Sequence, residues 1–185
     1  MKQIVAILVS MVAIVVFTTV YFYSSTEGIR EKVFQENGYT LQLEDPAVTA
    51  DVKIQKEWMN EKKTDVDEKV LKKGSSTVIL ESVSIDSESN YTLTFDIRQS
   101  FSNEENGGFL TSFNRGDGDA TFKPKENIAF YTANGEQIEL NKIKVGESSG
   151  PNERYMVTLD RDYLSSVEGY IRMELDYQYY TYTQE

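Results

Sequence analysis

The sequence predicts an N-terminal transmembrane helix followed by a mainly-β extracytoplasmic domain, an antiparallel β-sandwich of immunoglobulin-like type. Three observations predict this class: an uncharged run at Ile4–Tyr23, later segments in which apolar and polar residues alternate, and turn signals between those segments. The alternative is an α+β domain, in which a helix over residues 45–73 packs on one curved antiparallel sheet.

The uncharged run is long enough to cross a bilayer. At about 1.5 Å per residue, a helix over residues 4–23 would span roughly 30 Å. A cleaved signal peptide is the competing interpretation, but the run exceeds the usual apolar region of about 7–15 residues. The residues that follow offer no small-x-small pair without a Tyr or a Thr in it, as a cleavage site would need. We therefore expect a retained signal-anchor.

The charges around this segment predict its orientation. Residues 1–3 form a short head with Lys2, whereas most of the 19 basic and all 30 acidic residues follow the span. We expect a single-pass protein of the cell membrane, with the N-terminus in the cytoplasm and the domain outside. The composition is typical of a bacterial chain. The predicted divisions are 1–3 head, 4–23 span, 24–74 stalk and partly helical linker, and 75–185 sandwich.

The linker region is predicted to be partly helical. Residues 27–35 would prolong the span as a stalk that ends at Asn37-Gly38, and alternation over Tyr39–Leu43 indicates a short strand. Asp45-Pro46 is typical of a helix start, followed by the charge-rich residues 51–73. Val52 and Ile54 could equally begin a strand, so a helix over this region is one of two interpretations.

The later residues alternate with a period of two. This pattern predicts strands over 76–86, 90–99, 128–132, 137–141, 143–145, 154–160 and 169–183, with one helical turn over 160–167. The apolar parity changes between Leu80 and Val83, which predicts a bulge. Asn134-Gly135 is a hairpin signal, and 102–108 reads as a polar loop.

Composition excludes several kinds of chemistry. The chain of 185 residues has no Cys and no His, so it has no disulfide, no thiol nucleophile, no imidazole base and no Cys or His metal ligand. Its net charge of −11 disfavours nucleic acid as a partner. No motif is specific enough to assign a family, and no cofactor is expected.

The remaining candidate chemistry lies in acidic loops. Asp117-Gly-Asp119 begins like a calcium loop, but the pattern fails after these two carboxylates, so Asp117 and Asp119 are only weak metal candidates and no metal site is expected. Paired carboxylates can hydrolyse glycosidic bonds, which makes Glu104, Glu105, Asp117 and Asp119 candidates for a hydrolase.

The C-terminal strand is unusually rich in tyrosine. Alternation places Ile171, Met173, Leu175, Tyr177 and Tyr179 on one face and Tyr170, Tyr180 and Tyr182 on the outer face or frayed end. Exposed aromatic residues are enriched at interfaces, so these last three tyrosines are the candidate contact surface. A strand of this length is expected to project past the sandwich or to bend across it.

These observations favour a membrane-anchored extracytoplasmic binding or assembly module without catalytic activity. Its expected partners are the membrane, through the N-terminal helix, and a protein of the envelope. One alternative is a cell-wall or carbohydrate-directed hydrolase that uses the loop carboxylates. Another is a structural subunit of an envelope complex.

Overall fold

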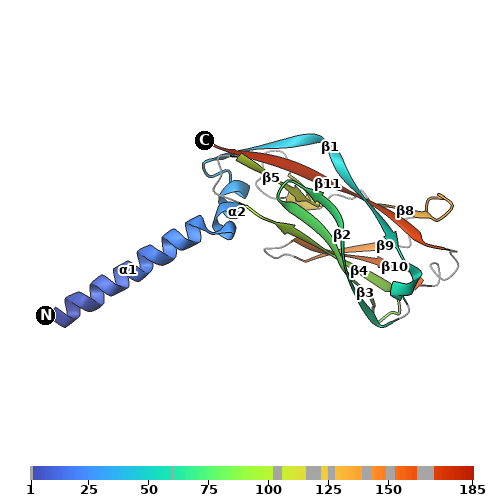
Figure 1. The fold of residues 1–185 in the computed structure, drawn as a ribbon, viewed down its shortest axis with the longest axis horizontal. Coiled ribbons are helices and arrows are strands. Elements are labelled where there is room, and N and C mark those ends of the chain that lie inside the picture. Colours follow the sequence, from blue (N-terminus) through green and yellow to red (C-terminus); the bar gives the residue numbers. More distant parts are fainter. Residues whose placement is uncertain are drawn as a thin grey trace.

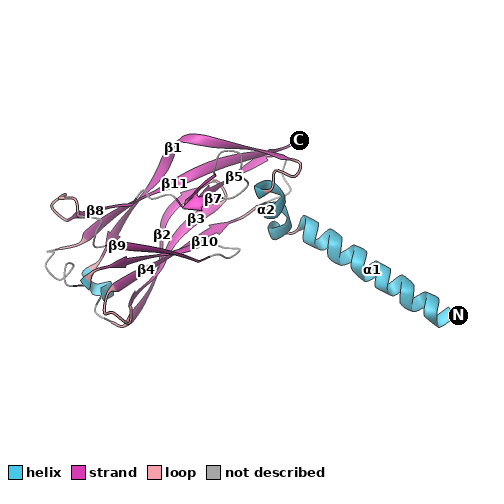
Figure 2. Cartoon of the chain, turned by 180° about the vertical axis from the view of Figure 1, so that it is seen from behind, coloured by secondary structure: helices cyan, strands magenta, loops and turns pink. Residues whose placement is uncertain are grey.

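The chain forms two N-terminal helices and two antiparallel sheets. The computed structural model describes residues 2–59, 61–101, 106–115, 122–124, 128–138, 143–148, 153–161 and 169–185. Helix α1 (Lys2–Ser24) projects away from the strands, and the shorter α2 (Thr26–Phe34) lies against one end of them (Figure 1). The sheets form two layers, as the view from behind also shows (Figure 2). This arrangement is consistent with the predicted β-sandwich.

Helix α2 is an element of its own. Ser25 interrupts the helix, and its hydroxyl accepts a hydrogen bond from Gly28 N at 3.1 Å, which caps the N-terminus of α2. Ile29 and Val33 are almost completely buried. The helical prediction over 27–35 is therefore confirmed. The prediction that it prolongs α1 as a stalk is wrong, because α2 packs on the sandwich.

The structure gives no support to the predicted membrane span. In α1, side chains are described for residues 10–21. Among the described residues, no helix is both long and apolar enough to cross a membrane. The span over 4–23 thus stays a prediction.

The first sheet is built around the C-terminal strand. β11 (Ile171–Gln184) pairs along one side with β1 (Tyr39–Ile54). Along its other side it pairs with β5 (Asn106–Thr111) near its end and with β8 (Ile128–Thr132) near its start. Both edges of β11 are paired near its end, so of the two predicted alternatives, projection past the sandwich is the one that the structure contradicts.

The second sheet has the order β2-β3-β4-β10-β9. Its strands are β2 (Lys63–Lys73), β3 (Ser76–Ile85), β4 (Tyr91–Gln99), β10 (Glu153–Leu159) and β9 (Ile143–Ser148). A 3₁₀ turn, η1 (Lys56–Met59), precedes β2, and β6 (Phe113–Arg115) pairs separately with β7 (Phe122–Pro124). Three consecutive strands lie side by side here, unlike the constant-type immunoglobulin sheets, so the immunoglobulin-like prediction is not confirmed.

The main core lies between the two sheets. It is formed by the inward side chains of both layers, among them Leu80, Leu93, Phe95, Phe130 and Met173, each at most 1% exposed. The predicted inner face of β11, from Ile171 to Tyr179, belongs to this core. The bulge predicted in β3 is also confirmed, because its register with β4 shifts between Leu80 and Ser82.

The predicted helix over 45–73 is wrong, and so is the α+β alternative with a single sheet. Residues 39–54 and 63–73 are strands, and of the described residues between them only η1 is helical. In β1 the inward residues Ala50, Val52 and Ile54 are buried while Asp51 and Lys53 are exposed. β2 is an edge strand, where charged side chains meet water and discourage further pairing. The region predicted as linker therefore contributes strands to both sheets.

Most of the other predicted strands are present. The structure has strands close to the predicted segments 76–86, 90–99, 128–132 and 154–160, and it extends the predicted 143–145 to residue 148. The Asn134-Gly135 hairpin is confirmed, because Gly135 has φ +84° and Gln137 pairs with Tyr131. The rest of the predicted strand 137–141 and the helical turn 160–167 lie largely outside the described residues. Part of the predicted loop 102–108 is strand β5.

Candidate binding groove

Side chains of the second sheet satisfy the outer edge of β5. Ser76 Oγ accepts from Leu110 N at 2.9 Å, Gln99 Nε2 donates to Leu110 O at 2.7 Å, and Ser75 Oγ donates to Gly108 O at 2.8 Å. An unpaired strand edge is a template for another chain. These bonds close that edge within the molecule and connect the two sheets.

Glu153 completes this closed edge with a buried carboxylate. It accepts hydrogen bonds from Thr111 Oγ1 at 2.9 Å, Ser112 N at 3.1 Å and Gln99 Nε2 at 3.2 Å. Burial raises the pKa of the Glu153 carboxyl, while these donors and the positive charge of Arg30 on α2 lower it. Burial thus favours the neutral form of this carboxyl, and its hydrogen-bond donors favour the charged form.

A second apolar cluster, here called the aromatic junction, holds α2 against the end of the first sheet. It consists of Ile29, Val33, Tyr39, Phe101, Phe109, Tyr180 and Tyr182, with Phe34 and Leu41 at its margin. The rings of Phe109 and Tyr180 stack with their centroids 5.7 Å apart, and Phe34 meets Phe101 edge-on at 5.8 Å. The aromatic junction therefore covers this part of the outer face of the sheet and excludes water from it.

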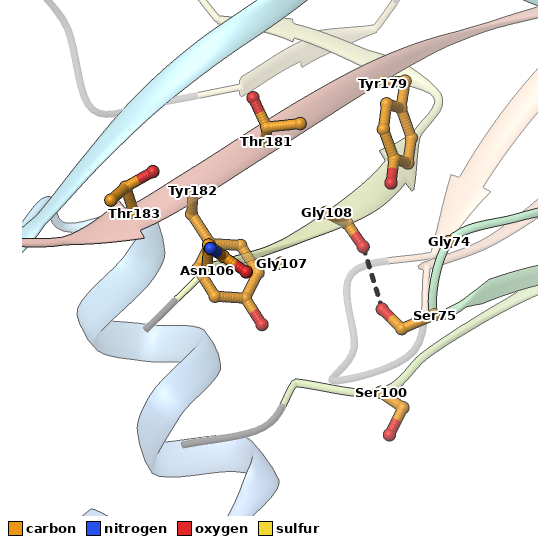
Figure 3. A pocket seen from close by; sticks show the side chains of 10 residues that line it. All are labelled: Gly74, Ser75, Ser100, Asn106, Gly107, Gly108, Tyr179, Thr181, Tyr182 and Thr183. Atoms are coloured by element: carbon orange, nitrogen blue, oxygen red, sulfur yellow. Dashed lines mark hydrogen bonds between the residues drawn. The ribbon is translucent and has the colours of Figure 1, made fainter. Parts of the chain in front are cut away.

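Beside the aromatic junction lies an open groove with a volume of about 470 Å³. The turn between β2 and β3, the end of β4, and strands β5 and β11 contribute its walls (Figure 3). Its side chains include the hydroxyls of Ser75, Ser100, Thr181 and Thr183. A cavity of this size falls within the range of small-molecule sites, about 300–1,000 Å³.

Two tyrosines bring their hydroxyls to this groove from opposite faces of β11. Tyr179 and Tyr182 are three positions apart, so their side chains leave the strand on different sides. A Cβ on Gly108 would lie closer than 3.0 Å to the Tyr179 hydroxyl, and a Cβ on Gly107 equally close to the Tyr182 hydroxyl. The two glycines thus give the phenol groups the room they occupy.

The groove is uncharged, although an ion pair lies at its margin. None of the described residues that line it carries a formal charge. Lys73 Nζ lies 4.0 Å from the centre of the Tyr179 ring and 3.0 Å from Glu44 Oε2. Burial, and then the Glu44 carboxylate, raise the pKa of Tyr179, whereas Lys73 opposes this rise. Tyr182 adds the smallest contribution to this rise.

The predicted contact surface is not an exposed one. Tyr180 is 5% and Tyr182 2% exposed, because α2 covers the outer face to which the alternation assigned them. The prediction of Tyr180 and Tyr182 as exposed interface residues is therefore wrong. Tyr170 is half-buried, and Lys53 Nζ lies 5.3 Å from the centre of its ring. Of the three, only Tyr182 lines the groove.

The acidic candidates lie outside the described residues. This applies to Glu104, Glu105, Asp117 and Asp119, so the expectation that no calcium site forms there and the hydrolase alternative both stay untested predictions. Within the part of the chain that the structure describes, no three acidic side chains are grouped to hold a metal ion.

The sequence analysis missed most of the groove. Gly107 and Gly108 were assigned to a polar loop and Tyr179 to the core, and Ser75 was given no role. The sequence held one signal for the groove, the glycine pair at 107 and 108, since a glycine within a strand often marks a place where another group approaches the backbone closely. To use this signal, one must know that β5 pairs with the tyrosine-rich strand β11, and local patterns do not show that pairing.

Comparison of the chain with protein-family models, with curated proteins and with solved structures finds no match. The functional argument therefore depends on the residues of the groove, the junction and α1.

Proposed function

We propose that this protein is a membrane-anchored extracytoplasmic binding or assembly module without catalytic activity. The observation that carries the proposal is the apolar surface of α1. Ile14, Val15 and Phe17 are 63%, 62% and 73% exposed, and other large apolar residues around the helix are similarly uncovered. Such a surface is unfavourable in water, whereas a lipid bilayer would cover it on every side.

In this proposal the N-terminus lies in the cytoplasm and the sandwich lies outside the membrane. The uncharged run from Ile4 to Tyr23 would form the span, and the acidic remainder of the chain would be translocated. α2 would follow the membrane directly. Figure 1 shows that β5 and the C-terminal end of β11 lie beside α2. Because these strands line the groove, the groove would lie at the end of the domain nearest the anchor.

The groove supports binding rather than catalysis. It offers hydroxyl, amide and backbone groups, and no charged side chain among its described lining. General acid–base catalysis commonly uses a positioned His, Glu, Asp or Lys. Hydroxyl groups without such a partner recognise a ligand through hydrogen bonds. A protein of the envelope or an envelope component would be the partner.

Membrane extraction tests the anchor. The full-length chain should remain in the membrane pellet after alkaline carbonate washing. Each Lys at the centre of a span opposes insertion by about 2.5–3.5 kcal/mol. The double substitution Ile14→Lys and Val15→Lys should therefore move the chain to the soluble fraction.

The matched control places the same residue type on the sandwich. Met156 is 38% exposed, and Met156→Lys should leave the chain in the pellet. Recovery of the unsubstituted chain in the carbonate supernatant would refute the anchor. Protease added to intact cells should degrade the sandwich, and its full protection would refute the orientation.

A further inference from the structure

We infer that the groove binds a neutral saccharide. The inference rests on the proposed binding function and names the ligand class of that site. It starts from the hydroxyls of Tyr179 and Tyr182. Both side chains are more than nine-tenths buried, yet their hydroxyls make no hydrogen bond to any group of the described residues. Both point into the groove (Figure 3).

The two phenol hydroxyls are available to a ligand, although their rings are buried. They face the open groove rather than the closed interior, and a phenol hydroxyl can both donate and accept a hydrogen bond. The glycines at 107 and 108 leave room for both hydroxyls at the surface of this groove. The packed rings thus fix the positions of the two oxygen atoms before a ligand binds.

The residues that line the groove favour an uncharged ligand. Ser75, Ser100, Thr181 and Thr183 add hydroxyls, and Asn106 adds an amide. Each hydroxyl both donates and accepts, and the amide offers one oxygen and two N–H donors. An ionic ligand would find no opposite charge in this lining, since Lys73 at the margin is paired with Glu44. The ligand that matches is neutral and carries several donors and acceptors close together.

A saccharide fits this requirement better than a peptide. Peptides commonly bind a sheet by adding a strand to an open edge. β11 is paired along both edges, and Ser75, Ser76 and Gln99 already occupy backbone groups of β5. The backbone pairing that a peptide needs is therefore blocked at this position, while the hydroxyl groups of a sugar can reach the unpartnered phenols.

Calorimetric titration of the full-length chain tests the inference. The protein should be kept in a detergent without a sugar headgroup and titrated with maltotriose, cellotriose and the neutral trimer of N-acetylglucosamine. Trigalacturonate and tetra-alanine provide the anionic and peptide comparisons. We expect at least one neutral trisaccharide to bind and both comparison ligands to give no signal.

Removal of the two oxygens locates the site. The double substitution Tyr179→Phe and Tyr182→Phe keeps both rings and should weaken saccharide binding about tenfold. The melting temperature should not fall, because neither oxygen bonds a described residue. Tyr170→Phe, the same change outside the groove, should leave the affinity unaltered.

Three results would overturn the inference: no binding of any neutral trisaccharide at millimolar concentration, equal binding by the double variant, or binding of only the peptide or the anionic sugar. None of these outcomes bears on the anchor, which the carbonate extraction tests separately. Release of the chain by carbonate would in turn refute the anchor while leaving the titration interpretable.

Discussion

The main core and the aromatic junction bury apolar surface in different ways. The main core lies between two sheets and takes the inward residues of each strand, such as Leu80 and Met173. The junction lies on the outer face of one sheet and depends on α2 to cover Phe109, Tyr180 and Tyr182. The comparison teaches that the alternation of apolar and polar residues along a strand identifies its buried face only where no other element packs on the opposite face of the sheet.

The difference also concerns how each cluster would come apart. Opening the main core requires separating paired strands, whereas opening the junction requires only the release of a nine-residue helix. Local opening free energies range from near zero up to the global value, and elements with few buried contacts open first. α2 is therefore expected to detach before the sandwich unfolds.

The largest expected effect comes from Phe95→Ala in the main core. Phe95 is fully buried and stacks on Tyr155 with 5.0 Å between ring centroids. Truncation of a buried Phe usually lowers the free energy of unfolding by about 3–5 kcal/mol. Denaturant unfolding of the full-length chain should show this loss, and hydrogen exchange should accelerate throughout both sheets. Met156→Ala, at a partly exposed side chain of β10, should change little.

An intermediate and local effect is expected for Ile29→Ala in the junction. Removing most of this buried side chain should weaken the packing of α2 by about 2 kcal/mol, at the lower end for such truncations. Exchange should accelerate in α2 while the amides of β3 and β4 keep their protection. Glu31→Ala, on the exposed side of the same helix, is the control. Equal acceleration in both sheets would show that the junction and the core form one cooperative unit.

The smallest effect is expected for Glu153→Gln, at the buried carboxyl beside β5. Burial raises the pKa of this carboxyl above its ordinary value of 4.5, although hydrogen bonds from Thr111, Ser112 and Gln99 and the charge of Arg30 oppose the rise. The folded state then binds a proton more tightly than the unfolded state. The stability that this proton contributes is complete below pH 4.5 and is lost as the pH rises through the folded pKa.

Glu153→Gln should therefore gain stability relative to the unsubstituted chain as the pH rises from 4.5 towards neutrality. Melting temperatures measured across this range give the comparison. The control is Glu136→Gln, at an exposed side chain. The difference in melting temperature between this variant and the unsubstituted chain should stay constant across the range. If the melting temperature of Glu153→Gln also varies with pH in parallel with that of the unsubstituted chain, the pKa of Glu153 does not change on folding.

Much of the sheet structure could be predicted because it depends on local alternation. β4, β8 and the inner face of β11 show it clearly, and the parity change in β3 indicated its bulge. Residues 45–73 misled the prediction since Lys and Glu are good helix formers and Asp45-Pro46 is a common helix start. What makes β1 a strand is its pairing with β11, which is remote in the sequence.

The groove could not be predicted for the same reason. Gly107 and Gly108 lie in β5 and its tyrosines in β11, whereas Gly74 and its serines lie next to β3 and β4. Alternation placed Tyr182 on the outer face correctly, but no local pattern shows that α2 covers that face. A site assembled from four distant segments becomes visible only through their pairing.

The pairing of β1 with β11 also has a consequence for how the chain folds during synthesis. Thr40 and Glu185, which bond each other across these strands, are 145 positions apart. A ribosome that adds about 5–20 residues per second leaves β1 without its partner for several seconds or longer. Contacts of such long range also slow folding, because loop closure comes before the stabilising contacts. β1 therefore waits as an unpaired strand until β11 emerges, and this interval is when the nascent chain is most exposed to aggregation.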